Sequence, residues 1–235
     1  AIFLYAARAF RDFGDGFVAV LLAVYLTELG HGPFEVGIVA TAALLGSALM
    51  TLGIGLLGAQ YAERTLLLLA SALMVATGFA FAGAESYPAL LLVAFVGTIN
   101  PSAGSVSVFV PLEHALLAGA ATDAGRTKMF AFYGLIGALA AALGSLASAS
   151  PDFLVAAGWT RLDAIQAMFV VYALLGIAGG LCYRRVPRDA PHLEKAPRAP
   201  LGPSRGIVYR LAALFSIDAF AGGFAVQSLL ALWLF

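Results

Sequence analysis

Apolar stretches long enough to cross a bilayer alternate with short polar breaks along the chain. A helix needs about 20 apolar residues to cross the hydrocarbon layer. The breaks have turn chemistry, as in Gly30-His31-Gly32-Pro33 and Ser150-Pro151-Asp152. The pattern predicts seven membrane spans, at 3–27, 36–58, 65–84, 89–111, 128–149, 163–183 and 207–235.

The composition indicates whether these spans lie in water or in lipid. Hydrophobic residues make up 62% of the 235 residues and charged residues only 11%, whereas an ordinary soluble domain has roughly 25% charged residues. We therefore expect an integral membrane protein with the lipid bilayer as its main partner. The zero net charge gives no sign of a nucleic-acid partner, and none is expected.

Basic residues are unevenly distributed between the breaks. The breaks after the second, fourth and sixth spans hold Arg64, then Arg126 and Lys128, then Arg184, Arg185, Arg188, Lys195, Arg198 and Arg205. The other breaks hold only Arg161. Because basic loops stay on the cytoplasmic side, we expect a multi-pass protein of the cytoplasmic (inner or plasma) membrane with its N-terminus in the cytoplasm.

The segment 184–206 differs from the other breaks. It combines five prolines with basic residues, a composition that buries no core and is typical of an extended linker. We interpret it as a cytoplasmic tether, with contact to anionic lipid headgroups as the alternative. It divides the chain into a six-helix bundle at 1–183, the linker at 184–206 and the first helix of a second bundle at 207–235.

The segment after the linker repeats features of the first span. An acidic residue, a glycine, an aromatic and an aliphatic residue occur in that order at Asp12, Gly14, Phe17 and Val18, and again at Asp218, Gly222, Phe224 and Val226. Carriers built from two six-helix halves have such repeats. Since the chain stops at Phe235 inside an apolar run, we expect a fragment whose partner is the C-terminal half of the same transporter.

The link between the second and third spans resembles a motif of the major facilitator superfamily of secondary transporters. The motif runs Gly, any, Leu, small, Asp, basic, any, Gly, Arg, basic, two of any residue, then Leu. The chain matches it at Gly55, Leu57, Gly58, Arg64 and Leu67. It departs from it at Ala59, Gln60, Ala62 and Glu63. The exit from the first span, 29–37, is also similar to that family's turn into its second span.

The resemblance implies a fold and an activity. The fold is all-α and membrane-embedded, with a six-helix bundle and the start of a seventh transmembrane helix as part of a 12-helix transporter. The activity is movement of a small solute by alternating access. Proton-coupled drug exporters of this superfamily carry an arginine in the fourth span and a proline in the fifth. Neither occurs here, so we do not assign the chain to the drug–proton antiporters.

Four charges interrupt the first apolar span and form the first candidate site. Arg8, Arg11, Asp12 and Asp15 are spaced i, i+3, i+4 and i+7, which places them on one stripe of a helix. A charge at the bilayer centre costs at least roughly 2.5 kcal/mol. We expect Asp12 or Asp15 to bind a proton or cation and Arg11 to bind an anionic group, with Arg8 as a gate. In the alternative, two i, i+4 ion pairs only lock the helix end.

The fourth span and its end supply further candidates, since the resemblance places the first, fourth and seventh spans around a central cavity. Asn100, before Pro101, is a candidate polar contact for the substrate. Glu113 and His114 follow near the cytoplasmic end, where we expect a gate or interface contact with Arg8 or Arg11; a proton relay is the alternative. We place Arg64, in the link motif, in the same gate or interface group.

The seventh span supplies Asp218 and Gln227 as candidates for binding substrate or coupling ion. An isolated acidic residue in a span is costly unless another helix supplies a partner or the residue holds a proton. Asp15 and Asp218 would then form a site shared between the halves.

Other sequence features have packing explanations. Small residues recur at Gly134, Gly137 and Gly144 of the fifth span, a pattern that lets helices approach closely. Tyr183 lies near a predicted membrane border, where an interfacial aromatic belt is the default interpretation.

Other functional classes fit less well. No hydrolase or zinc-protease motif occurs, so we expect no enzyme, no metal and no cofactor apart from a coupling proton or cation. Both lysines, Lys128 and Lys195, lie in breaks, which excludes a retinal pigment bound in the last span. A seven-helix receptor or sensor without transport activity is the alternative to a secondary transporter.

Overall fold

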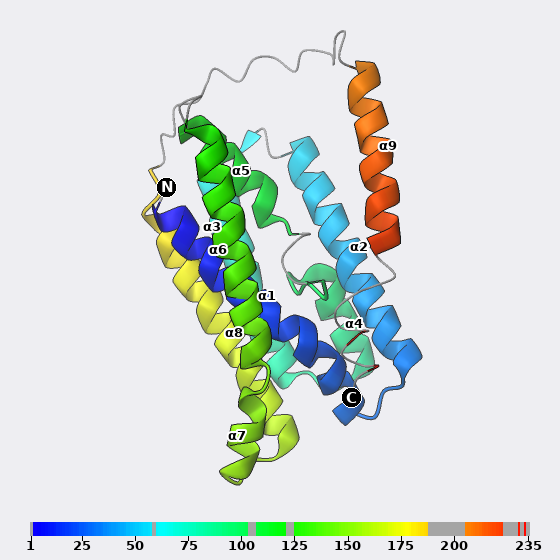
Figure 1. Ribbon diagram of the computed structural model, residues 1–235. Helices are drawn as coiled ribbons and strands as arrows, with labels where there is room; N and C mark the ends of the chain where they lie inside the picture. Colours follow the sequence, from blue (N-terminus) through cyan, green and yellow to red (C-terminus); the bar gives the residue numbers. More distant parts are fainter. Residues whose placement is uncertain are drawn as a thin grey trace.

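The computed structural model describes residues 2–57, 60–102, 107–120, 125–187 and 205–222, together with 230 and 233. Within these residues the chain is helical and has no strand. The helices are α1 (Ile2–Glu28), α2 (Pro33–Leu57), α3 (Glu63–Gly83), α4 (Tyr87–Val96), α5 (Phe109–Ala120), α6 (Arg126–Ala147), α7 (Ser150–Ala156), α8 (Arg161–Arg184) and α9 (Arg205–Gly222). Figure 1 shows them as an elongated bundle. The all-helical membrane fold predicted from the hydrophobic pattern is confirmed.

The long helices follow the predicted spans. Four helical stretches of the described chain have the length and hydropathy needed to cross a membrane: α2, α3, α6 together with α7, and α8. The 27-residue α1 also has the length, but it carries the four charges of the stripe. The count of six complete spans and the start of a seventh stays a prediction, as do the three predicted segments of the chain.

The fourth span differs from its prediction. It was predicted as one helix over 89–111, but α4 ends at Val96 and α5 begins at Phe109. Pro101 lacks an amide hydrogen and disfavours helical geometry at the residue before it. Gly97 ends α4 with extended backbone. The amide of Gly97 makes the last helical hydrogen bond of α4, to the carbonyl of Val93, and residues 98–102 are not helical. Glu113 lies inside α5 and not at a helix end.

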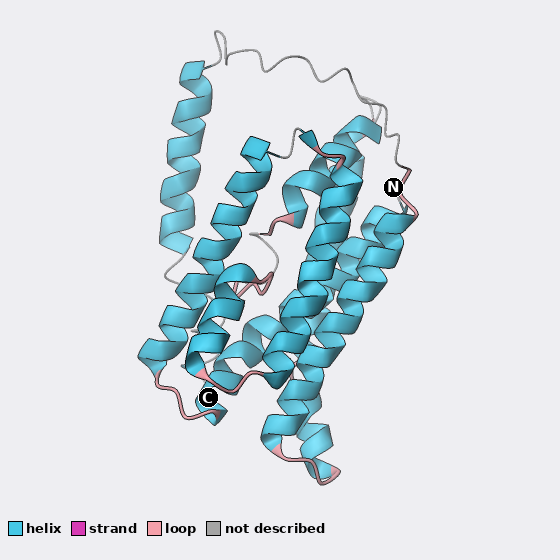
Figure 2. Cartoon of the chain, turned by 180° about the vertical axis from the view of Figure 1, so that it is seen from behind, coloured by secondary structure: helices cyan, strands magenta, loops and turns pink. Residues whose placement is uncertain are grey.

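The first helix lies between α6 and α8, and α8 also packs against α3. A second group forms where α2 packs against α4, as Figure 2 shows from behind. Aromatic rings fill the core between α1, α3 and α8: Tyr25 lies 5.1 Å from Phe169, and Phe81 lies 5.3 Å from Phe169, between ring centroids. The Tyr25 hydroxyl lies 3.0 Å from the carbonyl oxygen of Phe81 and 2.7 Å from that of Ala84, and these two acceptors share its one proton.

Glycines set the close approach of α1 and α6. A Cβ atom on Gly16 would meet the carbonyl oxygen of Ala141, and one on Gly144 would meet the carbonyl oxygen of Phe13. A Cβ on Gly137 would meet the side chains of Arg8 and Asp12. The packing role predicted for the small residues is confirmed at Gly137 and Gly144.

Replacing Gly144 with Ala is expected to lower the free energy of unfolding by about 1–3 kcal/mol, because the added methyl group would overlap backbone that cannot move alone. Thermal unfolding of purified protein in detergent, followed by loss of the monodisperse gel-filtration peak, measures the change. The matched control is Gly134→Ala on the same helix, where a Cβ meets nothing within 4 Å. Equal stability of the two variants would contradict the close-packing argument.

Candidate functional site

The charged stripe of α1 is buried among the helices of this chain. The exposed fractions are 9% for Arg8, 3% for Arg11, 1% for Asp12 and 1% for Asp15. Since α1 packs against α6 and α8, the single-stripe spacing turns all four charges inward together. A buried charge must be paired or neutralised, so the partners of each group decide its chemistry.

One of the two ion pairs that the spacing allows is formed. The Nε atom of Arg8 lies 2.6 Å from Oδ2 of Asp12, an i, i+4 pair. Arg11 does not pair with Asp15 within the described residues. Its Nη2 lies 3.3 Å from Oδ1 of Asp12, and its Nη1 lies 2.7 Å from Oε2 of Glu113 on α5. The alternative of two self-neutralising pairs on α1 is therefore wrong for Arg11, because a carboxylate from another helix takes its guanidinium.

Glu113 is the centre of this network and is fully buried. The hydroxyl of Tyr133 on α6 donates to its Oε2 at 2.5 Å, and the hydroxyl of Tyr183 on α8 donates to its Oε1 at 2.6 Å. Arg8 donates to the Tyr133 hydroxyl at 3.1 Å. The guanidinium carbon of Arg11 lies 4.9 Å from the ring centroid of Phe109. One carboxylate thus joins α1, α5, α6 and α8 in a network of charge-assisted hydrogen bonds.

Tyr183 and His114 also contribute to this region. Tyr183 is 1% exposed, so its assignment to an interfacial belt was wrong: its ring stacks on Phe109 and its hydroxyl binds Glu113. The ring of His114 lies 5.1 Å from both Phe130 and Tyr133. The expected contact between Glu113 and Arg11 is present, whereas a gating role for either side chain stays a prediction.

Asp15 has a different environment from Asp12. Within the described chain no cation lies in ion-pair distance of it, and the hydroxyl of Tyr172 on α8 lies 3.3 Å from its Oδ1. The same hydroxyl lies 3.3 Å from the carbonyl oxygen of Thr98 in the break after α4. The buried cluster therefore holds two guanidinium groups and three carboxyl groups, and Asp15 is the carboxyl group without a bound cation.

The remaining predicted residues differ from one another in burial and in their contacts. Asn100 is 2% exposed, and its Oδ1 accepts the amide of Ser102 at 2.9 Å. Arg64 donates to the carbonyl of Arg184 at 2.7 Å and so links the start of α3 to the end of α8. Asp218 is exposed on α9, so the structure does not bring it to Asp15. Gln227 lies outside the described residues.

The sequence interpretation missed Tyr133, Tyr172 and Thr98. A signal was available for Tyr172, because it lies in the middle of an apolar span and not at a membrane border, whereas Tyr133 lies near the start of its span. A buried tyrosine hydroxyl usually has a hydrogen-bond partner. Mid-span tyrosines therefore indicate a buried polar group on a neighbouring helix.

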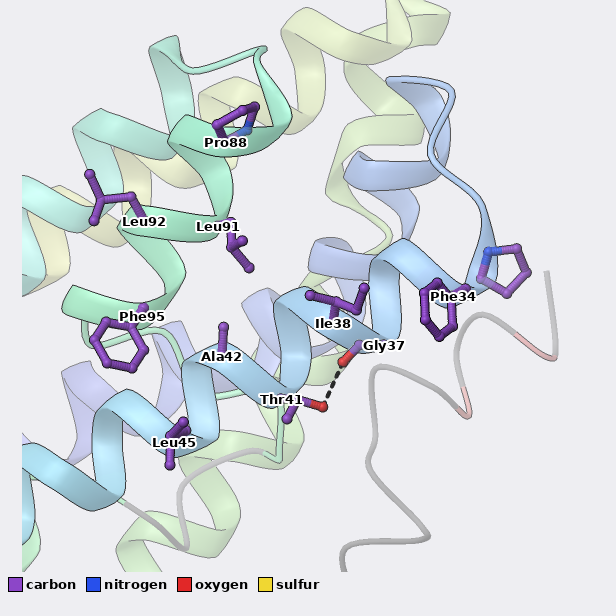
Figure 3. A pocket seen from close by; sticks show the side chains of 11 residues that line it. Phe34, Gly37, Ile38, Thr41, Ala42, Leu45, Pro88, Leu91, Leu92 and Phe95 are labelled. Carbon is purple, nitrogen blue, oxygen red and sulfur yellow. Dashed lines mark hydrogen bonds between the residues drawn. The ribbon is translucent and has the colours of Figure 1, made fainter.

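A second feature is an apolar groove between α2 and α4, shown in Figure 3. Its volume is about 880 Å³. The lining consists of Pro33, Phe34, Gly37, Ile38, Thr41, Ala42, Leu45, Pro88, Leu91, Leu92 and Phe95. The hydroxyl of Thr41 is bound to the carbonyl of Gly37 at 2.8 Å. The described residues that line the groove include no charged side chain. Across the described ranges, His, Cys, Asp and Glu residues form no cluster of three that could hold a metal.

The family model described as Major Facilitator Superfamily matches residues 4–235. The chain is similar to the uncharacterized membrane protein YJR124C of Saccharomyces cerevisiae, with 25% identity over 173 residues. That match covers 72% of this chain and 39% of the yeast protein, so the chain spans about two fifths of the length of this relative. No solved structure matches the chain.

Proposed function

Because the chain belongs to the major facilitator superfamily, we propose that the protein moves a small solute across the membrane by alternating access and exchanges a proton at Asp15. As a multi-pass membrane protein of this family it is consistent with a transporter. The family membership does not favour the receptor alternative. In the proposal the second six-helix half is the structural partner of this chain, and the two halves rock around the site.

The observation that carries the proton proposal is the excess carboxyl group of the buried cluster. Asp12 contacts both arginines, and Glu113 contacts Arg11 and two tyrosines. Within the described residues, Asp15 receives a hydrogen bond from one neutral hydroxyl and from no cation. An ionised carboxylate is costly inside a membrane protein unless a cation accompanies it. Asp15 is therefore the group at which a proton can enter or leave without breaking an ion pair.

The other candidates have supporting roles in this proposal. Arg11 is the proposed contact for an anionic group of the substrate: its Nη atoms are held by Glu113 and Asp12, and its Nε atom has no hydrogen-bond partner within the described residues. Asn100 is the proposed polar substrate contact from the broken fourth span. Asp218 and Gln227 are proposed contacts from the seventh span, and Arg8, Arg64, Glu113 and His114 are proposed gate or interface groups.

The test is a solute screen with the full-length protein in lipid vesicles that contain a pH-sensitive dye. We expect at least one class of small solute to change the internal pH when it is added outside, because solute and proton cross in a fixed ratio. Vesicles without protein are the control. Solute movement without any pH response would contradict proton coupling, and no movement of any solute would contradict the transporter assignment.

A further inference from the structure

Tyr172 lies between the unpaired carboxyl group of α1 and the break in the fourth span. It is fully buried on α8. Its ring packs on Gly14, where a Cβ atom would meet the ring edge. Its hydroxyl lies 3.3 Å from Oδ1 of Asp15, 3.3 Å from the carbonyl oxygen of Thr98 and 3.2 Å from the Thr98 hydroxyl. A single oxygen atom thus touches three polar groups on two separate elements.

The Tyr172 hydroxyl has one proton and can donate one hydrogen bond at a time. Two acceptors compete for that proton, the Asp15 carboxyl group and the Thr98 carbonyl. The Thr98 hydroxyl does not compete in the same way, because it can rotate and donate its own proton to the Tyr172 oxygen. The charge on Asp15 therefore decides which acceptor receives the tyrosine proton.

We propose that Tyr172 is a positioning residue that transmits the protonation state of Asp15 to the backbone of the break at 97–102. When Asp15 is ionised, the Tyr172 proton points to the Asp15 carboxylate, and the Thr98 carbonyl loses this donor. When Asp15 takes a proton from water, the new hydroxyl donates to the Tyr172 oxygen, and the Tyr172 proton turns to the Thr98 carbonyl. The tyrosine stays protonated in both states, so the only proton gained or lost is the one on Asp15.

The break responds through the carbonyl of Thr98, which accepts from the Tyr172 hydroxyl. Thr98 follows the last turn of α4, and its own amide donates to the Thr77 hydroxyl at 3.3 Å. Thr98 is half-buried and outside a helix, so its carbonyl loses free energy when its donor leaves. Tyr172 is the donor that the structure gives to the Thr98 carbonyl within the described chain. When Asp15 is protonated, the segment 97–102 therefore has one more hydrogen bond and opens less often.

The charged groups around Asp15 do not offer a competing switch. On α1 itself these are Asp12, Arg11 and Arg8, which are joined in ion pairs with each other and with Glu113 on α5. Helix α6 contributes Tyr133, which is bound to Glu113 and Arg8. Helix α8 contributes Tyr172 itself. A proton that arrives at Asp15 therefore changes the Tyr172 hydrogen bond before it changes any ion pair.

The inference rests on the proposed proton exchange at Asp15, so the experiment measures the proton and the break separately. The full-length protein in lipid nanodiscs is titrated with acid and base. Infrared difference spectra follow the carbonyl stretch of a protonated carboxylic acid, assigned to Asp15 by its absence in Asp15→Asn. Amide hydrogen exchange of a peptide that covers 97–102, corrected for the intrinsic effect of pH, follows the break. We expect both signals to change over the same pH range in the unaltered protein.

The Tyr172→Phe variant is expected to keep the Asp15 band and its titration but to lose the pH dependence of exchange at 97–102. The matched control is Tyr25→Phe, which removes a buried hydroxyl that binds backbone carbonyls on another part of the core; it should retain both signals. Thr98→Val, which keeps the backbone carbonyl, should also retain both. In Asp15→Asn, amide exchange at 97–102 should be slow at every pH. This variant tests the inference even if Tyr172→Phe does not fold.

Two results would overturn the inference. If the Asp15 band titrates but exchange at 97–102 does not depend on pH, or depends on it equally in Tyr172→Phe, then the tyrosine transmits nothing while the proton site stands. If no Asp15 band titrates, the proposed proton exchange itself fails, and the inference fails with it.

Discussion

Vesicles that contain the Asp15→Asn variant are expected to exchange solute between the two sides but not to accumulate it against a gradient. Asn is neutral and has the shape of a protonated aspartic acid, so the variant resembles a carrier that never releases its proton. Exchange of internal for external solute needs no net proton movement, whereas accumulation does. Gradient-driven uptake should fall to the level of empty vesicles, and the measurement is uptake of the solute found in the screen, with and without an imposed pH gradient.

The controls for this prediction separate coupling from folding. Asp152→Asn changes an aspartate whose side chain is 72% exposed and lies 4.0 Å from Arg161, so its uptake should equal that of the unaltered protein. Asp15→Asn should appear in the membrane in normal amount, because removing a buried negative charge that has no bound cation does not leave a cation without its partner. Normal gradient-driven accumulation by Asp15→Asn would rule out Asp15 as the coupling residue. Loss of both exchange and accumulation would assign it to substrate binding or folding.

The helical membrane fold and the burial of the stripe could be predicted from the sequence because both depend on local periodicity. Apolar runs of span length give helices, and the spacing of Arg8, Arg11, Asp12 and Asp15 places them on one face of α1 whatever surrounds it. The ion pair between Arg8 and Asp12 follows from the same spacing. These features need no knowledge of which helices are neighbours.

The partners from other helices could not be predicted in this way. From the spacing on α1 alone, Arg11 would pair with Asp15. It pairs instead with Glu113, which is 102 residues away, because the packing of α5 brings that carboxylate to the guanidinium. Tyr183 is near a helix end, and only the tertiary contact with Glu113 shows that it is a buried donor. The sequence places Pro101 in the fourth span, but one proline does not indicate that the chain is non-helical from 98 to 102.

The Glu113→Ala variant is expected to lose about 3–5 kcal/mol of unfolding free energy, the loss typical when one partner of a buried ion pair is removed. The change leaves Nη1 of Arg11 and the hydroxyls of Tyr133 and Tyr183 without the carboxylate that accepts their hydrogen bonds. It also leaves a cavity at a site with no exposed surface. Thermal unfolding in detergent, or the amount of folded protein recovered from membranes, measures the loss.

Two further variants test the origin of this stability. Glu113→Gln keeps the volume and one acceptor oxygen, so it should lose less stability than Glu113→Ala if hydrogen bonds and packing carry much of the effect. Glu85→Ala removes an exposed carboxylate and should stay within about 0.5 kcal/mol of the unaltered protein.

If Glu113→Ala is as stable as the unaltered protein, the network that joins α1, α5, α6 and α8 does not hold the bundle together. A double variant, Arg11→Met with Glu113→Leu, adds a second comparison. If the bundle depends on the network, the double variant should be more stable than Glu113→Ala, because no buried charge is left without its partner. If it does not, the two variants should have similar unfolding free energies.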